Sequence, residues 1–363
     1  MNAGSSSLKL RLLNDDTLEK RADLAAGAKG FDTAELARFV RSWAVPDAVG
    51  HRIVHGGVTF RGPAIVTPAV RAQLEALTDL APLHQPKSLA ALDAVTTVLP
   101  QVVAVASFDT AFHTTLPDAA ATYAIPREWR DRYAIRRYGF HGLSHAYSSR
   151  RVAEMLDRPR ATLRVVTCHL GAGASLAAVV GGRSVDTTMG FTPLEGLVMA
   201  TRSGSIDPGL VLWLEEHARL SPREIATALE ERSGMMALAG TSDMRQIEAA
   251  AMRSDPDAVL AVDVYIHRLV GSIAAMCAAA GGLEALVFTG GVGENSLLVR
   301  RITASRLGFL GVAINDVASD EVDRDISTDD AAVRTFVIAA REDLQIARET
   351  RVLLGASAGK AVA

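Results

Sequence analysis

The apolar positions of this chain fall into short runs that end at turns of glycine and other small residues. The clearest run, Leu163 to Leu170, predicts a buried strand. A small-residue turn, Gly171 to Ser175, follows it. Two further short runs, Leu176 to Val180 and Ser184 to Thr187, flank Gly181-Gly182 and predict a β-hairpin. Because glycine lets backbone N–H groups approach a ligand closely, the hairpin is either a phosphate cradle or a tight turn between core strands.

The same order of features occurs at the N-terminus. The small-residue segment Asn2 to Ser7 leads into Leu8-Lys9-Leu10. A turn at Asn14-Asp15-Asp16 and a returning run, Thr17 to Arg21, come next. Such self-similarity implies a duplicated fold unit. Two related halves, each with a phosphate-binding hairpin, would hold a nucleotide in the cleft between them.

Helical and strand patterns alternate along the rest of the chain. Helical spacing is found over residues 31–45, 70–80, 88–99, 221–232 and 259–280. A further helix is expected after the segment 138–145 and ends at about residue 157. Strand patterns are found over residues 47–55, 101–107, 286–289 and 335–340. Alternation of this kind, together with the duplication, predicts an α/β protein of two related domains.

Composition narrows the class of protein without identifying it. A length of 363 residues suggests two domains, and 49% hydrophobic with 22% charged residues is typical of a soluble globular protein. The net charge of −3 provides no basic field for a nucleic acid. We expect Cys168 and Cys277 to be buried reduced thiols, which indicates a reducing compartment. The N-terminus is polar from Asn2 onward and has no secretory pattern.

The most apolar helical segment, Val259 to Ala280, is not a typical membrane span. It contains Asp263, His267 and Arg268. Charged side chains within such a segment favour a buried helix or a helix at a subunit interface.

Polar residues that could do chemistry follow the predicted strands. Asp109 follows the strand 101–107, and open α/β sheets bind their ligands at the carboxyl ends of such strands. An alternative role for Asp109 is that of a helix N-cap. The segment Gly290 to Asn295 lies between a strand and a helix, an arrangement that suits the phosphates or ribose of a nucleotide. No segment matches GxxxxGK[ST], and Gly171-x-Gly173 lacks the third glycine of a dinucleotide fingerprint.

Several cationic side chains lie in loops near these turns. They are His84, His141, His169, Arg52 and Arg202. Each histidine alone could be a structural hydrogen-bonding group. Together, fixed cations near glycine turns favour phosphoryl transfer, whose transition state spreads negative charge over the phosphoryl oxygens.

Oxygen ligands for Mg²⁺ are available at the ends of predicted strands. Mg²⁺ is usually held by one or two carboxylates and water. Asp109 and Glu342 are the candidates, with Asn2 able to contribute through water.

These motifs resemble those of the acetate kinase family, within the superfamily of acetate and sugar kinases, Hsp70 and actin. The resemblance extends from Asn2 to about Leu354 and is carried by NAGSSSLK, HRIVHGG, APLH, FDTAFH, YGFHGLSH, HLGAGAS, MGFTPLEGLVMATRSGSIDP and GGVGEN. It implies a duplicated ribonuclease H-like (actin-like ATPase) fold with the active site between two related domains. The implied N-terminal domain spans residues 1–109 plus about 345–363, and the C-terminal domain spans 110–344. The implied reaction is a Mg²⁺-dependent, reversible, in-line transfer of the ATP γ-phosphoryl group to acetate, giving acetyl phosphate and ADP.

The resemblance also implies roles for individual residues. Asn2, Asp109 and Glu342 would hold Mg²⁺, or Mn²⁺ in its place. The catalytic residues would be Asp109, His141, Arg202 and Arg52, with both arginines on the carboxylate and the transferring phosphoryl group, and with His84 and His169 lining the site. The pocket for the acetate methyl group would consist of Val54, Leu83, Phe140 and Pro193. ATP and ADP would be bound by Lys9, His169, Gly171, Gly173, Asp243, Met244, Arg245, Gly290, Gly291, Gly293 and Asn295.

The chemistry of the acceptor limits what Asp109 does. A carboxylic acid with a pKa of about 4–5 is already ionised at pH 7, so the nucleophile needs no strong general base. We therefore interpret Asp109 as a metal-binding and orienting residue. The resemblance further implies a cytoplasmic homodimer, formed through the second domain, with no nucleic-acid or membrane partner.

Some positions depart from the family pattern and leave alternatives open. Only Met1 precedes Asn2, so we expect a truncated first strand, and the segment between residues 13 and 50 is short. Four side chains differ from the family's Asn or Asp, namely Gln85, Ala172, Ser205 and Arg341. One alternative is a kinase for propionate or butyrate, because one extra methylene changes the discrimination between substrates by only about 1–3 kcal/mol. The other is a non-catalytic nucleotide-binding relative, because a fold alone does not prove activity.

Overall fold

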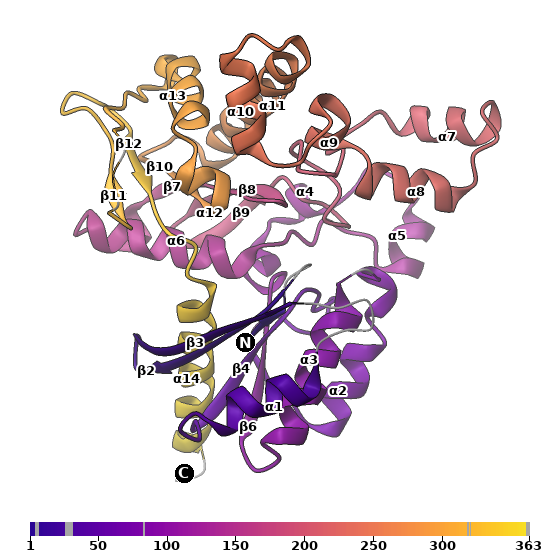
Figure 1. Cartoon of the computed structure of the whole chain (residues 1–363), viewed down its shortest axis with the longest axis vertical. Coiled ribbons are helices and arrows are strands. Elements are labelled where there is room, and N and C mark those ends of the chain that lie inside the picture. Colours follow the sequence, from indigo (N-terminus) through magenta and orange to yellow (C-terminus); the bar gives the residue numbers. More distant parts are fainter. Residues whose placement is uncertain (4–6, 26–31, 83, 318, 320, 361–363) are drawn as a thin grey trace. The chain divides into compact units, whose positions relative to one another are not determined.

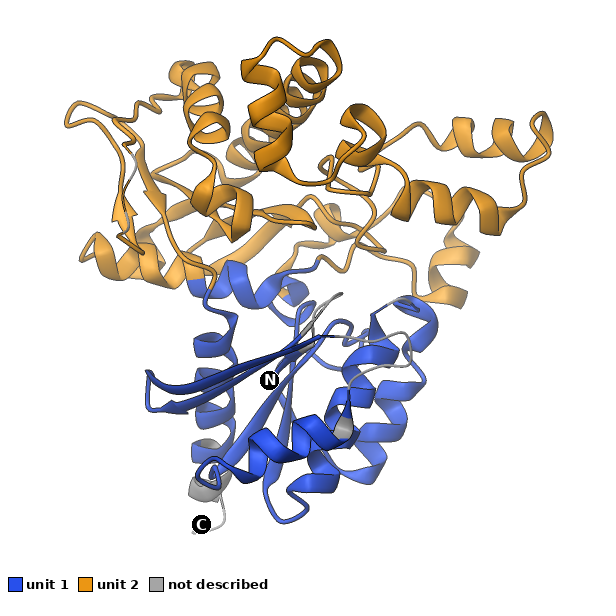
Figure 2. Ribbon diagram, in the orientation of Figure 1, with its two compact units in different colours: residues 1–114, 140–147, 341–363 blue, residues 115–139, 148–340 orange. Residues whose placement is uncertain are grey.

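The chain packs into two compact units (Figure 2). The computed structural model describes residues 1–360 except for 4–6, 26–31, 83, 318 and 320. Unit 1 comprises residues 1–114, 140–147 and 341–363, and unit 2 comprises residues 115–139 and 148–340. These units are close to the two domains expected above, whose boundaries stay predictions.

The strands of unit 1 form two three-stranded sheets, which Met1 joins into one layer (Figure 1). The strands are β1 (Asn2–Ala3), β2 (Ser7–Asn14), β3 (Thr17–Ala25), β4 (Ala48–Ile53), β5 (Ala64–Ile65) and β6 (Val103–Phe108). The orders of the two sheets are β1-β2-β3 and β4-β6-β5. The predicted hairpin of β2 and β3 is confirmed, and β1 pairs antiparallel with β2, placing Asn2 opposite Lys9. Met1 joins β1 to β4, because its amino group donates to the Gly50 carbonyl at 2.8 Å and its carbonyl accepts from Arg52 N at 3.0 Å. Joined through Met1, the two sheets form one layer in the order β3-β2-β1-β4-β6-β5.

Helices cover both faces of this layer. They are α1 (Thr33–Arg41), α2 (Pro68–Glu75), α3 (Gln85–Val98) and α14 (Glu342–Lys360). Leu36 of α1 and Leu92 of α3 are buried in the cores against β2 and β4. Gly50 of β4 allows α14 to pack closely, since a Cβ atom there would lie 2.4 Å from Ile346 Cγ2. Side chains alternate along a strand, so Arg52 shares the α14 face of β4 with Gly50.

Unit 2 contains a six-stranded sheet in the order β9-β8-β7-β10-β12-β11. The strands are β7 (Arg164–Leu170), β8 (Ala174–Val180), β9 (Arg183–Thr187), β10 (Ala285–Thr289), β11 (Arg324–Asp325) and β12 (Arg334–Val337). The hairpin predicted at residues 176–187 is confirmed. Gly181 and Gly182 have φ values of +60° and +78°, the left-handed backbone that a two-residue hairpin turn requires.

The layer of unit 1 and the sheet of unit 2 repeat one topology, which confirms the predicted duplication. In both, the central strand pairs antiparallel with a hairpin on one side, and on the other side lie two parallel strands and a short antiparallel edge strand. The central strands are β1 and β7. By register, Asn2 in β1 and His169 in β7 occupy corresponding places, each one residue before the last pair with the following strand.

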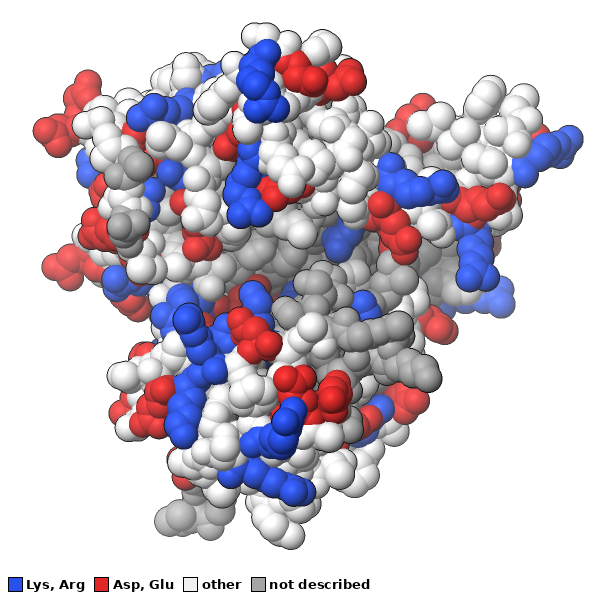
Figure 3. All heavy atoms as spheres, in the orientation of Figure 1, with Lys and Arg blue, Asp and Glu red and all other residues white. Residues whose placement is uncertain are grey.

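Unit 2 also contains most of the helices. They are α4 (Asp118–Ala121), α5 (Arg127–Tyr133), α7 (Pro208–Glu216), α8 (Pro222–Glu231), α9 (Gly234–Ala239), α10 (Met244–Met252), α11 (Pro256–Ala280), α12 (Gly290–Asn295) and α13 (Leu297–Arg306), while α6 (Gly142–Met155) begins in unit 1. Ser221 caps α8 in a capping box with Glu224. On the face shown in Figure 3, acidic and basic side chains are interspersed.

The long helix α11 contacts β7, β8 and β9. It is the one helix among the described residues whose length and apolar composition would suit a membrane span, and 39% of its most apolar window is buried. Tyr265, Ile266 and Ile273 are buried, whereas Asp263 and His267 are exposed. Core helices of soluble proteins have the same properties, so this composition is weak support for a membrane role. Cys168 and Cys277 are buried and free, as predicted.

Candidate functional site

In unit 1, Arg52 gathers the predicted metal ligands around one guanidinium group. Its Nε lies 3.1 and 3.0 Å from the two carboxylate oxygens of Asp109, and its Nη2 lies 2.6 Å from Oδ2. Nη1 donates to Asn2 Oδ1 at 3.1 Å. Glu342 completes the cluster, since its Oε2 accepts from Asn2 Nδ2 at 2.5 Å and lies 3.8 Å from Arg52 Nε. Residues that are far apart in the sequence therefore meet where β1, β4 and β6 end and α14 begins.

The surrounding elements hold this cluster rigidly. The backbone N–H of Asp109 donates to the Ile53 carbonyl at 3.0 Å, and its carbonyl accepts from Gly142 N at 2.9 Å. A Cβ atom at position 142 would lie 2.2 Å from that carbonyl oxygen, so the contact requires glycine. The Asp109 side chain is only 1% exposed. It is thus a buried carboxylate with a defined orientation and not the N-cap of a regular helix.

Burial and charge act in opposite directions on these groups. Burial raises the pKa of Asp109, and the charge and hydrogen bonds of Arg52 offset only part of that rise. Burial alone lowers the pKa of Arg52, but Asp109 and Glu342 outweigh it and raise that pKa above its ordinary value. Arg52 therefore stays charged and serves as the internal counter-ion of two carboxylates.

The oxygen donors of this cluster fit a magnesium ion. Two carboxylates and one amide, completed by water, match the hard ligands and the high water content that Mg²⁺ prefers. Within the ranges that the structure describes, no group of three or more His, Cys, Asp and Glu side chains is arranged to hold a metal. The candidate set has only two such residues, Asp109 and Glu342, and both contact Arg52 in this arrangement.

Four further predicted residues of unit 1 lie just after a strand or just before a helix. His141 has a φ of +55°, a left-handed backbone that is uncommon for a residue with a side chain. It directly precedes α6, and its carbonyl accepts from His145 N at 3.0 Å. Val54 and Phe140 are buried, and His84 directly precedes α3. Leu83, predicted for the acceptor pocket, lies outside the described residues.

In unit 2, Arg202 and Pro193 are in direct contact. Arg202 Nη1 donates to the Pro193 carbonyl at 3.0 Å. Burial lowers the pKa of Arg202, and Glu230 offsets part of that effect. Gly234, with a φ of +62°, allows the chain to approach this loop, since a Cβ atom there would lie 2.1 Å from the Met199 carbonyl oxygen. Two residues predicted to contact the acceptor thus share one rigid loop.

The first predicted nucleotide turn follows β7. His169 pairs in register with Ser175 of β8 and with Thr289 of β10. The turn is closed by a hydrogen bond of 3.0 Å from Gly171 N to the Gly173 carbonyl. His169 and these glycines therefore lie at the carboxyl end of the central strand, the position that favours ligand binding in such sheets.

The second glycine segment differs from its prediction. Residues 290–295 form the short helix α12 themselves, instead of a turn before a helix. Gly290 has a φ of +79°, and a Cβ atom there would lie 2.8 Å from the Leu170 carbonyl oxygen, whereas position 291 is open. The close approach of α12 to β7 therefore needs glycine at 290.

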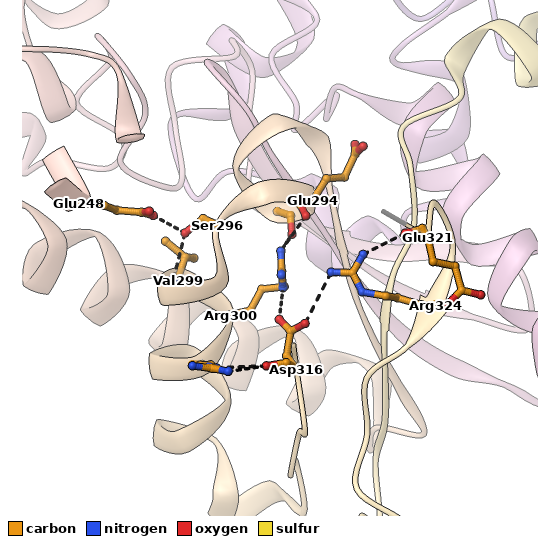
Figure 4. A network of polar contacts seen from close by, with 10 residues as sticks. Glu248, Glu294, Ser296, Val299, Arg300, Asp316, Glu321 and Arg324 are labelled. Carbon is orange, nitrogen blue, oxygen red and sulfur yellow. Dashed lines mark hydrogen bonds and ion pairs between the residues drawn. The ribbon is translucent and has the colours of Figure 1, made fainter. Parts of the chain in front are cut away.

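The sequence reasoning missed Glu294 and Arg300, which hold this segment (Figure 4). Glu294 Oε1 accepts from Gly290 N and from Ala340 N, both at 2.9 Å. Arg300 Nη1 donates to the carbonyls of Gly293 and Glu294 at 2.8 Å each, and its Nε contacts the buried Asp316 at 2.5 Å. The single acid within GGVGEN was the available signal for Glu294, whereas no signal pointed to Arg300.

The predicted adenosine residues at the start of α10 are partly exposed. Asp243 caps the helix by accepting from Arg245 N at 3.0 Å. The Arg245 side chain returns to the same carboxylate, with Nη2 2.7 Å from Oδ2. The hydrogen bond from Arg245 lowers the pKa of Asp243. Met244 between them is buried and belongs to the core.

Three of the departures from the family pattern have structural partners. Gln85 is buried and donates from Nε2 to the carbonyls of His55 and Leu74 at 3.3 and 3.1 Å. Ser205 Oγ accepts from Gly196 N at 3.1 Å. Arg341 pairs with Asp343 at 3.0 Å. These substitutions therefore have structural contacts of their own.

The comparisons of this chain with known proteins all indicate the same family. A sequence model described as the acetokinase family matches residues 31–348. A protein of Deinococcus radiodurans named acetate kinase is 44% identical over 388 aligned residues, covering 98% of this chain and 97% of that protein. The crystal structure of Porphyromonas gingivalis acetate kinase has a TM-score of 0.89 at 34% identity, covering 97% of this chain and 98% of that one. A propionate kinase from Francisella tularensis has a TM-score of 0.87, also at 34% identity, covering 96% of this chain and 97% of that one.

Proposed function

This chain belongs to the acetokinase family, and we propose that it transfers the γ-phosphoryl group of ATP to acetate, giving acetyl phosphate and ADP, and catalyses the reverse reaction. It is an ATP:acetate phosphotransferase. The observation that carries this proposal is the cluster of Asn2, Arg52, Asp109 and Glu342, which combines a fixed cation with oxygen ligands at the strand ends of unit 1. A protein that only bound nucleotide would not need a group of side chains for a second substrate, the acceptor carboxylate.

The reaction requires the chain to bring two anions together. An acetate oxygen attacks the γ-phosphorus in line as the bond to the ADP oxygen breaks, and no proton has to be removed because acetate is ionised. Arg52 and Arg202 neutralise the carboxylate and the transferring phosphoryl group. His141 contacts that phosphoryl group, and its left-handed backbone fixes the place from which its side chain extends. His84 and His169 line the site.

Asn2, Asp109 and Glu342 are the residues that would hold Mg²⁺, with Mn²⁺ as a substitute. When bound, the ion supplies positive charge to the phosphate oxygens of ATP. Binding it requires Arg52 to give up part of its contact with the two carboxylates. That release would leave the guanidinium group free for the acceptor carboxylate.

The nucleotide is held in unit 2 by the segments that follow β7 and β10. Backbone N–H groups near Gly171, Gly173, Gly290, Gly291 and Gly293 lie next to the phosphates and ribose. Met244, between Asp243 and Arg245, together with Asn295, borders the adenosine, and Lys9 contributes a cation from unit 1.

The protein functions as a cytoplasmic homodimer formed through the second domain. An apolar surface on α7 supports this assembly, because no residue of that fully described helix is buried, and Leu212 and Trp213 are 59% and 53% exposed. Large exposed apolar side chains grouped on one element are typical of an interface.

Acyl phosphate trapping tests the proposed function. The protein is incubated with Mg-ATP and acetate, propionate or butyrate, and the product is trapped as the hydroxamate. We expect acetate to be the preferred acceptor and Arg202→Ala to abolish turnover. No product with any of the three acids would refute the kinase function, and preference for propionate would refute the assignment of acetate.

The role of Asp109 has its own test. Asp109→Asn should lose activity mainly by raising the Mg²⁺ concentration needed for half-maximal rate, because one of two ligand carboxylates becomes a neutral amide. Titration with Mn²⁺, followed by electron paramagnetic resonance, measures the metal affinity directly. If that affinity were unchanged and excess Mg²⁺ restored nothing, Asp109 would act in another way.

A further inference from the structure

Glu195 lies in the motif MGFTPLEGLVMATRSGSIDP, residues 189–208, but none of the roles given above belongs to it. In unit 2 it lies between two partners from outside that segment, Tyr123 and Arg137. We refer to Tyr123, Arg137 and Glu195 together as the brace. Arg137 Nη2 contacts Glu195 Oε1 at 2.6 Å, and the Tyr123 hydroxyl donates to Oε2. Both carboxylate oxygens are therefore used.

The brace also binds the backbone of the loop that contains Glu195. Arg137 Nη1 donates to the carbonyls of Thr188 and Met189 at 3.1 Å each. The Tyr123 hydroxyl accepts from Phe191 N at 2.9 Å. Burial raises the pKa of Tyr123, so its hydroxyl remains a donor throughout the physiological range. Contacts with Tyr123 and Arg137 therefore hold the loop over residues 188–195 at several of its positions.

Gly190 shows how closely the brace packs on this loop. A Cβ atom at position 190 would lie 1.7 Å from Glu195 Oε2 and 2.1 Å from the Tyr123 hydroxyl. The Gly190 carbonyl accepts from Tyr138 N at 3.0 Å and from Gly139 N at 3.3 Å. The segment 137–139 is therefore fixed to the loop through Gly190.

The two segments that the brace joins lead directly to predicted acceptor contacts. The loop contains Pro193, whose carbonyl also accepts from Arg202 Nη1 at 3.0 Å. The segment 137–139 is followed at once by Phe140 and His141. A shift of the loop would move Pro193 and the contact that orients Arg202. A shift of residues 137–139 would displace the backbone that leads into Phe140 and His141.

We propose that Glu195, acting through Tyr123 and Arg137, is a positioning residue that sets the acceptor side of the site, and that it therefore governs acetate affinity and acceptor choice without touching ATP. This inference rests on the proposed kinase function. Glu195 forms no bond to the substrate in this role. Its carboxylate accepts from a phenol and a guanidinium group at once, which a neutral amide cannot do with both donors.

Two conservative variants test the inference by steady-state kinetics. Glu195→Gln keeps the shape of the side chain, and Tyr123→Phe removes only the hydroxyl. Each should raise the KM for acetate about tenfold and leave the KM for Mg-ATP within about twofold, because a displaced loop loses contacts that bind acetate and leaves the nucleotide segments in place. Each should also reduce the preference for acetate over propionate. The double variant should lose about as much as the worse single variant, since both changes break one network.

Glu284→Gln is the matched control. Glu284 is also partly buried, 27% exposed against 34% for Glu195, and it accepts from Arg164 N at 2.7 Å at the opposite end of β7 from His169. It should leave both KM values unchanged. Equal rises of both KM values in Glu195→Gln, or kinetics like those of the control, would overturn the positioning role while leaving the kinase function intact. Failure of the unmodified protein to form any acyl phosphate would overturn both proposals.

Discussion

Replacing Arg52 with Met should destabilise unit 1 severely. The change leaves the Asp109 carboxylate, 1% exposed, without its bidentate partner, and leaves Glu342, 12% exposed, as an uncompensated like charge. Removing one member of a buried ion pair typically costs about 3–5 kcal/mol. That loss is a large part of a typical free energy of unfolding of about 5–15 kcal/mol.

The loss should depend on pH in a defined direction. Burial already raises the pKa of Asp109 in the folded protein, and the loss of Arg52 raises it further. An acid whose pKa is higher in the folded than in the unfolded state loses stability as the pH rises above its unfolded value of about 3.9. The difference between Arg52→Met and the unmodified protein should therefore grow from pH 4 to pH 8.

Urea unfolding followed by tryptophan fluorescence measures this difference. Of the three tryptophans, Trp43 lies in unit 1, so a background with Trp129→Phe and Trp213→Phe makes the signal specific for that unit. Adding Asp109→Asn to Arg52→Met should recover most of the loss, because the unpaired charge is removed.

Arg71→Met is the control for that experiment. Arg71 also makes a short pair with Asp93, 2.8 Å against 2.6 Å for Arg52 with Asp109, but the Asp93 carboxylate is 48% exposed. An exposed pair contributes only about 0–1 kcal/mol. If Arg52→Met cost no more than Arg71→Met, or if its cost did not change with pH, the buried-pair explanation would be wrong.

Two further predictions concern acid stability and the nucleotide segment. Burial lowers the pKa of His51 to about 3 and those of His55 and His113 to about 4, so these groups favour the folded state above pH 6.5 and lose that contribution as the pH falls. Between pH 7.5 and 5.5 the free energy of unfolding should fall by about 4 kcal/mol, measured by urea unfolding, and a flat profile would contradict this. Gly290→Ala should raise the KM for ATP about tenfold, because position 290 has a φ of +79° and no room for a Cβ atom. Gly308→Ala, a position outside the site where nothing lies within 4 Å, should behave like the unmodified protein, and equal effects in the two variants would contradict the argument.

Local patterns made the hairpins and the duplication predictable from the sequence. Gly181-Gly182 and Asn14-Asp15-Asp16 separate runs of strand length, and their turn chemistry is read directly from the residues. The helix over residues 290–295 was not predictable in this way, because three glycines in six residues argue against a helix. There the packing of Gly290 on β7 outweighs local propensity.

The site was only partly predictable, for a different reason. Strand ends marked Asp109 as a ligand position, but the meeting of Asn2 with Glu342 joins residues 340 positions apart and depends on the whole of unit 1. Glu195 lies within a motif that carries the resemblance, whereas Tyr123 and Arg137 lie outside those motifs. Their role arises from tertiary packing around Gly190, which no local period encodes.

Synthesis of ATP from acetyl phosphate tests the central claim most directly. The purified protein is given Mg-ADP with and without acetyl phosphate, and ATP is followed by luciferase, so that ATP formed from ADP alone is subtracted. The account predicts ATP formation that requires acetyl phosphate and disappears in Arg202→Ala. An absence of ATP, or an unchanged rate in Arg202→Ala, would contradict it.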